Sequence, residues 1–450
     1  MNKRIIMLMA AALALLSASG QVEFSNYGKY PPIEITLSDT HSTLNKIFVL
    51  YDTVGVSMTY TSPGGGRAVW KWYNSSNWGY PTEITDVSWD GVATTKLDRV
   101  YANKGYIIED ASGPFYCWVV NYADYYLTLN GLYCESQSPC GQLSLRVDGS
   151  SHLIPYTNID GRSLGLDREL ELSYNTLEWD EATTSWQDCP VTVKFDNKPI
   201  DPPLCNTVFR LSGDIFLTNE KWGLDEVEIF SSFYNTKAVS CRTTAVQEMR
   251  DNNNEEGNDN EEGLGGSAPV HIVFTGYPTD AVVYRSWEIS TDPEMENDVT
   301  SYPNQDVLDY TFDKFGTYYV RYTVNNAEGT CEYSNEIYTV NVAESELKDP
   351  PNVFSPGCTE GANDIWKVTY KSLVEFHCWI FNRWGNLVYE FTDPGGGWDG
   401  YYHGKLVDTG VYYYVLTATG SDGMKYKKRG DISILRYTRG GAAGDTGVEY

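Results

Sequence analysis

The sequence predicts an all-β protein built from tandem β-sandwich domains that are joined by linkers. Apolar and polar residues alternate with a period of two over several short segments, which is the pattern of strands with one face on a core. Aromatic residues make up 14% of the 450 residues, with 35 Tyr and 13 Trp, and these residue types favour strands. Clusters of turn-forming residues separate the segments, as is typical of sandwiches.

Six segments carry the clearest alternation, and each should bury one set of side chains while its neighbours face solvent. The sets expected to face a core are Ala68, Trp70 and Trp72; Leu143, Leu145 and Val147; Leu170, Leu172 and Tyr174; Val191, Val193 and Phe195; Tyr318, Val320, Tyr322 and Val324; and Val374, Phe376, Cys378 and Ile380. Turn clusters lie between them at 62–66, 148–150, 201–203 and 393–397.

The clearest domain boundary is the stretch 251–267, DNNNEEGNDNEEGLGGS, which has six acidic residues and no aromatic one. Because such a composition buries too little apolar surface to offset the entropy of ordering, we expect a flexible acidic linker. A calcium-binding loop is the alternative, but the regular alternation of ligands that such loops use is missing.

Two further boundaries are expected near residue 130 and at 344–351, where paired prolines stiffen the entry to the last domain. The chain length corresponds to roughly three or four domains of ordinary size. The predicted domains are two β-sandwiches at 21–130 and 131–250, a third domain at 268–343, and a last domain at 351–437 that is followed by a tail at 438–450.

The first twenty residues, 1–20, have the layout of a secretory signal peptide. Lys3 and Arg4 precede an apolar run at 5–16, and small residues at 18–20 suggest cleavage before Gln21. The run is too short for a bilayer, which takes roughly 20 apolar residues, and no later segment is long enough either. We therefore expect export and no transmembrane segment.

The formal net charge is −28, from 33 basic and 61 acidic residues. A chain of this charge repels phosphate backbones and anionic lipid. The composition therefore argues against nucleic acid more strongly than against any other class of binding partner.

Nine cysteines occur in a chain that is expected to leave the cytoplasm, where disulfides persist. The candidate pairs are Cys134 with Cys140, Cys189 with Cys205, and Cys358 with Cys378, although spacing does not fix connectivity and an odd count leaves at least one thiol unpaired. No Cys-x-x-Cys pair and no Cys/His cluster of zinc spacing occurs. We expect neither a metal site nor a cofactor.

A series of short motifs fills the last hundred residues. In order, they are Pro351-Asn352-Val353-Phe354-Ser355-Pro356, Asn363-Asp364, Ile380-Phe381-Asn382-Arg383-Trp384-Gly385, Gly397-Trp398-Asp399-Gly400, Gly404-Lys405 and Gly410-Val411-Tyr412-Tyr413-Tyr414. This series resembles the gliding-motility-associated C-terminal domain, also called the type IX secretion type B sorting domain. The resemblance implies an immunoglobulin-like sandwich of the Bacteroidetes cell envelope, with the type IX secretion machinery as partner.

The residues that mark this domain are Asn382, Arg383, Trp384, Gly385, Trp398, Asp399, Gly400, Gly410 and Tyr412. The segment 382–385 suits a hairpin turn, with Gly385 at positive φ and Arg383 lying on the Trp384 ring. Either these residues only fold the hairpin, or Arg383 also contacts a receptor, because exposed Arg–aromatic pairs often serve interfaces.

The chain departs from this family in one loop. The family usually places Asn-Gly-Asp-Gly after the opening Pro, whereas Gly357-Cys358-Thr359-Glu360-Gly361 stands here. The departure puts a function of that loop in doubt and leaves the expected fold unchanged.

The segment 268–343 resembles a PKD domain or a close immunoglobulin-like relative. Trp287-Glu288-Ile289-Ser290 stands where that family carries Trp-Asp-Phe-Gly, and 310–312 with 316–320 match its late strand pair. The resemblance implies a spacer or adhesion module. The domains at 21–130 and 131–250 match no family by motif, and their patterns also suit immunoglobulin-like sandwiches.

Catalytic residues are not expected. Gly161-Arg162-Ser163-Leu164-Gly165 fits the Gly-x-Ser-x-Gly pattern, but that nucleophile elbow needs a helix after Ser163 and a strand-like alternation follows instead. No histidine completes a Ser…Asp…His order in the same domain. A hydrolase at 131–250 is kept only as a third alternative.

The leading hypothesis is therefore a non-enzymatic interaction or adhesion protein, exported to the cell surface or secreted, whose last domain directs type IX secretion. Its surface partner, a protein or a glycan, is unknown. The second hypothesis is a glycan-binding protein that stacks sugars on Trp70, Trp72 and Trp78, although core packing explains most such tryptophans equally well.

Overall fold

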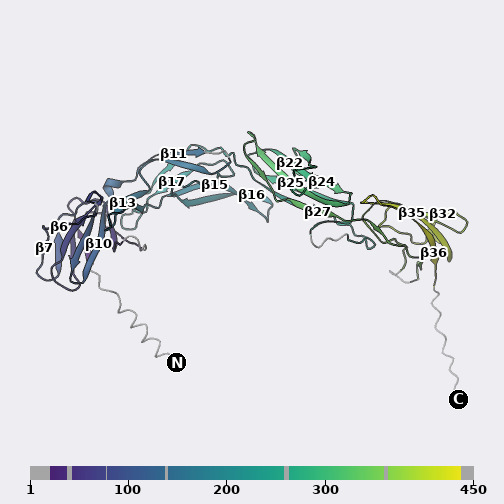
Figure 1. Cartoon of the computed structure of the whole chain (residues 1–450), viewed down its shortest axis with the longest axis horizontal. Coiled ribbons are helices and arrows are strands. Elements are labelled where there is room, and N and C mark those ends of the chain that lie inside the picture. The colour runs from purple at the N-terminus through teal and green to yellow at the C-terminus, as the bar shows by residue number, and fades with distance from the viewer. Residues whose placement is uncertain are drawn as a thin grey trace, which may run out of the picture. The chain divides into compact units, whose positions relative to one another are not determined.

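The computed structural model describes residues 21–37, 43–77, 79–136, 140–257, 263–358 and 363–436. The predicted leader, Trp78 and the predicted tail lie outside these residues. Figure 1 shows strands along the whole described chain, and the helical elements there are the 3₁₀ turns η1 (Ser75–Asn77) and η2 (Tyr122–Tyr125). The predicted all-β class of tandem β-sandwich domains is confirmed. None of the described helices is long and apolar enough to span a membrane.

The chain divides into two compact units. The first holds the described residues up to Glu178 together with Gln187–Thr236, and the second holds Trp179–Trp186 and the described residues from Lys237 onward. Each unit contains more than one hydrophobic core.

The first sandwich packs a four-stranded sheet against a six-stranded sheet. The smaller sheet has the order β1 (Gln21–Ser25), β4 (Ser57–Thr61), β8 (Thr94–Leu97) and β7 (Ser88–Trp89). The larger has the order β2 (Ile33–Thr36), β3 (Lys46–Leu50), β10 (Gly113–Asn121), β9 (Lys104–Asp110), β5 (Val69–Tyr73) and β6 (Thr82–Ile84), with β3 and β10 parallel.

The larger sheet is buried on both faces. In β3, Phe48 and Leu50 point into the core between the two sheets, while Ile47 and Val49 point into a second core. That second core is completed by residues from further along the chain, including Ile154 and Phe216, Leu217 and Trp222. Burial on two faces explains why these strands are almost continuously apolar instead of alternating.

The rest of the first unit consists of two hairpins and most of a four-stranded sheet, whose segment Trp179–Trp186 belongs to the second unit. The hairpins are β11 (Leu129–Ser136) with β12 (Leu143–Gly149), and β13 (Leu153–Thr157) with β14 (Ser163–Asp167). The sheet has the order β16 (Ser185–Lys194), β15 (Glu171–Asp180), β17 (Arg210–Gly213) and β18 (Val227–Phe230). Val193 is exposed, contrary to the alternation, because β16 is the edge strand of this sheet.

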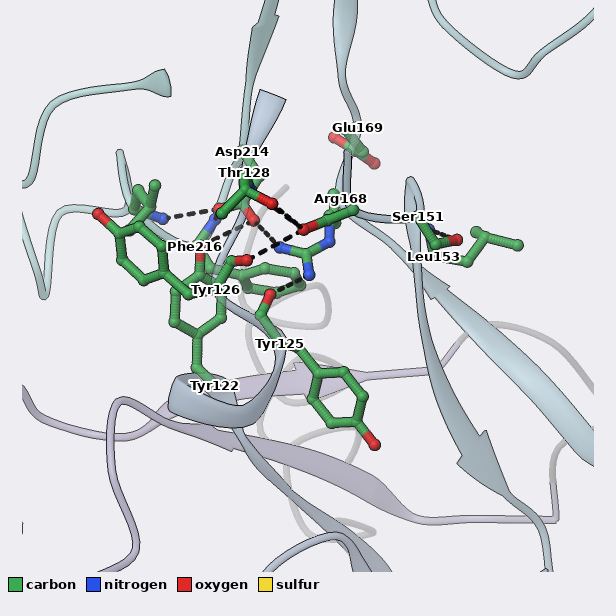
Figure 2. Close-up of polar contacts among 12 residues, drawn as sticks. Tyr122, Tyr125, Tyr126, Thr128, Ser151, Leu153, Arg168, Glu169, Asp214 and Phe216 are labelled. Atoms are coloured by element: carbon green, nitrogen blue, oxygen red, sulfur yellow. Dashed lines mark hydrogen bonds and ion pairs between the residues drawn. The ribbon is translucent and has the colours of Figure 1, made fainter. Parts of the chain in front are cut away.

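A buried ion pair joins the two halves of the first unit (Figure 2). The Arg168 guanidinium donates to the Asp214 carboxylate at 2.6 Å, and the two side chains are 2% and 0% exposed. The Tyr122 hydroxyl donates to the same carboxylate at 3.0 Å, and Arg168 also donates to the Tyr125 carbonyl. The 3₁₀ turn that closes the first sandwich is thereby tied to the segments around β14 and β17.

The second unit begins with a third sandwich. One sheet has the order β19 (Cys241–Gln247), β21 (Val270–Pro278) and β24 (Val307–Phe312). The other has the order β20 (Leu264–Gly266), β27 (Tyr338–Val342), β25 (Gly316–Asn326), β22 (Val282–Ser290) and β23 (Thr300–Pro303), with β26 (Glu332–Ser334) beside β25. Trp287 is buried between the sheets, with its ring 4.7 Å from that of Tyr322.

The acidic stretch differs from the flexible linker that its composition predicts. Leu264–Gly266 forms β20, which pairs in parallel with β27, and Asn254 and Glu255 are buried. Composition failed here because it averages over the stretch, whereas these two specific buried side chains find hydrogen-bond partners. Residues 258–262 lie outside the described ranges.

The C-terminal sandwich has a five-stranded sheet in the order β29 (Val353–Phe354), β36 (Lys425–Ile434), β35 (Gly410–Gly420), β31 (Leu373–Phe381) and β32 (Leu387–Phe391). The short pairs β28 (Glu346–Leu347) with β30 (Tyr370–Lys371), and β33 (Tyr401–Tyr402) with β34 (Lys405–Leu406), complete it. Phe376, Cys378 and Ile380 face the core as predicted, but a bulge in β31 turns Val374 to the surface.

We expect Asp214→Ala to lower the free energy of unfolding of the first unit by about 3–5 kcal/mol, because it leaves a buried guanidinium without its carboxylate. Urea denaturation of the full chain, followed by tryptophan fluorescence, measures this. The double variant Arg168→Met/Asp214→Leu should lose less than the single one, since it removes both charges. Equal losses in the two variants would contradict this account.

We expect His271 to make the stability of the third sandwich depend on pH. Its two ring nitrogens lie 2.7 Å from Glu248 and 2.6 Å from Asp309, and hydrogen bonds to Asp309 and then Glu248 raise the pKa of His271 above its ordinary value of 6.5. The folded state therefore binds the proton more tightly, so the stabilisation is complete below pH 6.5 and is lost as pH rises through the raised pKa.

Thermal unfolding between about pH 5.5 and 8.5 should show this falling stability in the parent chain. The variant His271→Gln should lack that part of the pH dependence. A parent and variant with parallel pH profiles would refute the assignment.

Candidate functional site

The segment Asn382–Gly385 forms the turn between β31 and β32, as predicted. The Asn382 and Gly385 amides donate to the Asn386 and Asn382 carbonyls at 2.9 and 3.0 Å, and the Asn382 side chain accepts from the amides of Trp384 and Asn386. Gly385 has φ +85°, a left-handed conformation that a residue with a Cβ adopts only with strain. Asn382 and Gly385 therefore shape the turn.

Arg383 and Trp384 project from this turn. The guanidinium carbon lies 4.3 Å from the centre of the Trp384 ring, and Trp384 is 70% exposed. An indole that remains this exposed while carrying a cation is available to a partner, because neither group contributes to the core.

A hollow of about 120 Å³ brings the turn together with the start of β35. It is lined by Asn382, Arg383 and Trp384 on one side and by 408–412 on the other. Five of the predicted motif residues, including Gly410 and Tyr412, therefore meet at one place although they come from separate motifs.

Tyr412 connects this hollow to the core. Its hydroxyl donates to the Asp408 carbonyl at 3.1 Å, and its ring packs edge-on against Trp398 with centroids 5.3 Å apart. Burial raises the pKa of the Tyr412 phenol, so it stays a neutral donor at neutral pH.

The Trp398-Asp399-Gly400 motif is structural. Trp398 is fully buried, exchanges backbone hydrogen bonds with Trp366 at 2.8 and 2.9 Å, and donates its indole N–H to the Tyr401 carbonyl at 3.1 Å. The Asp399 carboxylate accepts from the Tyr401 amide, and the Gly400 carbonyl accepts from the Val407 amide, each at 2.9 Å. None of the three belongs to the lining of the hollow.

The tryptophans predicted to contact a glycan do not form a platform among the described residues. Trp70 is 1% exposed and donates its indole N–H to the Thr95 hydroxyl at 2.9 Å, so the prediction is wrong for this residue: its ring fills the core. Trp72 is half-buried, with Lys104 4.5 Å from its ring centre. Trp78 lies outside the described residues.

Ser163 is the exposed first residue of β14, and β14 continues to Asp167. The strand follows Ser163 where a nucleophile elbow needs a helix. Ser163 pairs with Thr157, whereas the His152 carbonyl accepts from Arg168 at the other end of this hairpin.

None of the three predicted disulfides is formed. Cys134, Cys189 and Cys378 are free thiols, and each of the predicted pairs includes one of them. Burial raises the pKa of the Cys378 thiol to about 12, which suits a core residue on β31. Within the ranges that the structure covers, no group of three or more His, Cys, Asp or Glu residues is placed to hold a metal ion.

Sequence reasoning missed the buried pair of Arg168 and Asp214. The two residues are 46 positions apart, and neither falls in a recognisable motif. Only the tertiary structure brings them together.

Two families match parts of the chain. The CHU_C Type IX secretion signal domain matches residues 348–434, and the fibronectin type III domain matches residues 133–231. No curated protein matches the chain significantly. The chain therefore carries a type IX secretion signal domain near its C-terminus, preceded by a fibronectin type III domain, and the first of these implies contact with the secretion machinery and export to the cell surface or extracellular space.

Two solved structures are similar at low identity. A tetra-tandem repeat from the extending region of a large adhesion protein is 10% identical, with 93% of this chain and 100% of that chain covered and a TM-score of 0.20. The FN1–FN3 domains of chicken CNTN1 are 12% identical, with 68% and 99% covered and a TM-score of 0.24.

We expect the two tryptophans of the C-terminal motifs to respond differently to truncation. Trp398→Ala should destabilise the C-terminal sandwich by about 3–5 kcal/mol, because it removes a fully buried ring. Trp384→Ala should change stability by no more than about 0.5 kcal/mol, because this side chain is exposed. Thermal unfolding of the full chain distinguishes them, and similar losses in both variants would contradict the structural assignment.

Proposed function

We propose that this chain is a non-enzymatic interaction or adhesion protein that the type IX machinery delivers to the cell surface. The observation that carries the proposal is the type IX secretion signal domain at 348–434, folded as a sandwich with an exposed Arg383–Trp384 pair. In this proposal residues 1–20 are the cleaved leader that takes the chain through the inner membrane, and the sandwiches are displayed outside.

The hollow between 382–384 and 408–412 is the proposed contact for the machinery. Support comes from its composition: an exposed cation on an indole is the kind of group that anchors interfaces, and Asp408 supplies a carboxylate beside it. The remaining motif residues support this surface from the core side through Tyr412 and Trp398.

Residues 268–343 are proposed to act as a PKD-like or related immunoglobulin-like spacer. Support comes from the two-sheet fold of this segment, with Trp287 buried between its sheets. The proposed role is to hold other modules, and the sequence supplies no catalytic constellation for it.

Deleting residues 348–450 should leave the protein in the periplasm of a host that has the type IX machinery, because the type IX secretion signal domain is removed. Surface proteolysis and fractionation measure this. Arg383→Ala/Trp384→Ala in the full chain should reduce surface display several-fold at unchanged stability, whereas Trp89→Ala, which removes an exposed tryptophan elsewhere, should not. Undiminished display after the deletion would sink the proposal.

A further inference from the structure

The C-terminal sandwich takes up a strand from outside its matched range. Residues 254–256 run parallel to β30: the Tyr370 amide donates to the Asn254 carbonyl at 3.0 Å, and the Glu256 amide donates to the Tyr370 carbonyl at 2.8 Å. Successive residues of a strand point their backbone groups to opposite sides. The backbone of Tyr370 bonds to this segment, and the backbone of the preceding residue, Thr369, accepts a hydrogen bond from the chain just after β28. The segment therefore lies on the side of β30 away from β28.

Side chains of the same segment satisfy polar groups of the sandwich. The Asn254 amide donates to the carbonyls of Val368 and Pro394, each at 2.8 Å, and Asn254 is only 7% exposed. Glu256 pairs with Lys348 at the surface. Without this segment, the two carbonyls and the Tyr370 backbone would lose their partners, and each unsatisfied buried group costs roughly 1–3 kcal/mol.

Asn252 explains a glycine of the 395–397 run. A Cβ on Gly395 would lie 2.6 Å from the Asn252 Oδ1, and the nearest atoms to that position all belong to Asn252. The Asn252 amide also donates to the Tyr370 hydroxyl at 3.3 Å. The turn at 393–397 therefore leaves room for a residue that lies 143 positions earlier in the chain.

The other end of the segment is fixed to the third sandwich. Arg250 donates to the Glu255 carboxylate and to the carbonyls of Ser267 and Pro269. Burial opposes ionisation of Glu255, but the hydrogen bonds from Arg250 and its neighbours outweigh it and lower the pKa of this carboxyl. Ser267 and Ser372 then bond directly, with the Ser372 amide donating to the Ser267 hydroxyl at 2.7 Å.

We propose that residues 250–257, here called the strap, are a structural part of the sorting domain, so that the folded export unit includes this segment in addition to the matched range 348–434. The strap acts as a positioning element: it completes the edge at β30 and holds the sandwich against its neighbour. This inference rests on the proposed function for its effect on export, and on geometry alone for its effect on folding.

The first test compares Asn254→Asp with Asn253→Asp in the full chain. Both add one negative charge, but Asn253 is exposed whereas Asn254 loses both donated hydrogen bonds. We expect Asn254→Asp to speed amide hydrogen exchange at Tyr370 and Glu256 by roughly tenfold or more, and to reduce surface display several-fold. Asn253→Asp should match the parent in both measurements.

The second test uses a compensating pair, in case Asn254→Asp fails to fold. Gly395→Ala should raise exchange at Tyr370 and lower surface display, because its methyl group displaces Asn252. Adding Asn252→Ala removes the colliding atoms and should restore display at least in part. Asn252→Ala alone is the control.

Any of three results overturns the inference. The first is that Asn254→Asp leaves amide exchange at Tyr370 at the parental rate, and the second is that it speeds that exchange while surface display stays at the parental level. The third result is that Asn252→Ala does not restore the display of Gly395→Ala. Failure of the proposed function is recognised separately, because display would then survive deletion of 348–450. In that case the exchange measurements still decide whether the strap belongs to the sandwich.

Discussion

Backbone groups at the edges of short sheets have to find partners, and this requirement governs the arrangement of the second unit. Two pairs of short strands flank the main sheet of the C-terminal sandwich, and β30 would present an open side without the strap. The third sandwich uses the same acidic stretch, since β20 adds in parallel to β27. One stretch thus supplies edge strands to two neighbouring sandwiches.

The motif residues of the C-terminal sandwich fall into two groups, those that pack in its interior and those that are exposed on the hairpin turn. Trp398 and the groups around it pack in the interior. Tyr412 contacts the Trp398 ring and also lines the hollow beside the hairpin, so it connects the two. Arg383 and Trp384 are free to meet a partner because Asn382 and Gly385 have already fixed the turn. If this surface contacts the secretion machinery as proposed, its fixed backbone would keep the loss of conformational freedom on binding small.

The fold class followed from alternation because a strand with one buried face obeys a strict period of two. The predicted alternation is observed along β25, where Val320, Tyr322 and Val324 are all buried. It failed where a bulge or an edge interrupts that geometry, as at Val374 and Val193, because alternation carries no information about register. The hairpin at 382–385 was predictable because a turn of this kind depends on its own residues.

Other features depend on partners far along the chain, and local patterns could not reveal them. Arg168 meets Asp214 only after two halves of a unit come together. The composition of 251–267, averaged over the stretch, predicts a flexible linker and gives no sign that Asn254 and Glu255 are buried. Trp70 shows a related failure: a tryptophan in an alternating strand fits a core or a sugar platform equally well until its exposure is known.

The six-stranded sheet of the first unit has a practical meaning for protein engineering. Its second face carries Ile47, Val49 and Trp118 into a core that later residues complete. A gene fusion that transplants residues 21–130 as a cassette would place this apolar face in water, where it invites self-association. The transferable module is the whole of that unit.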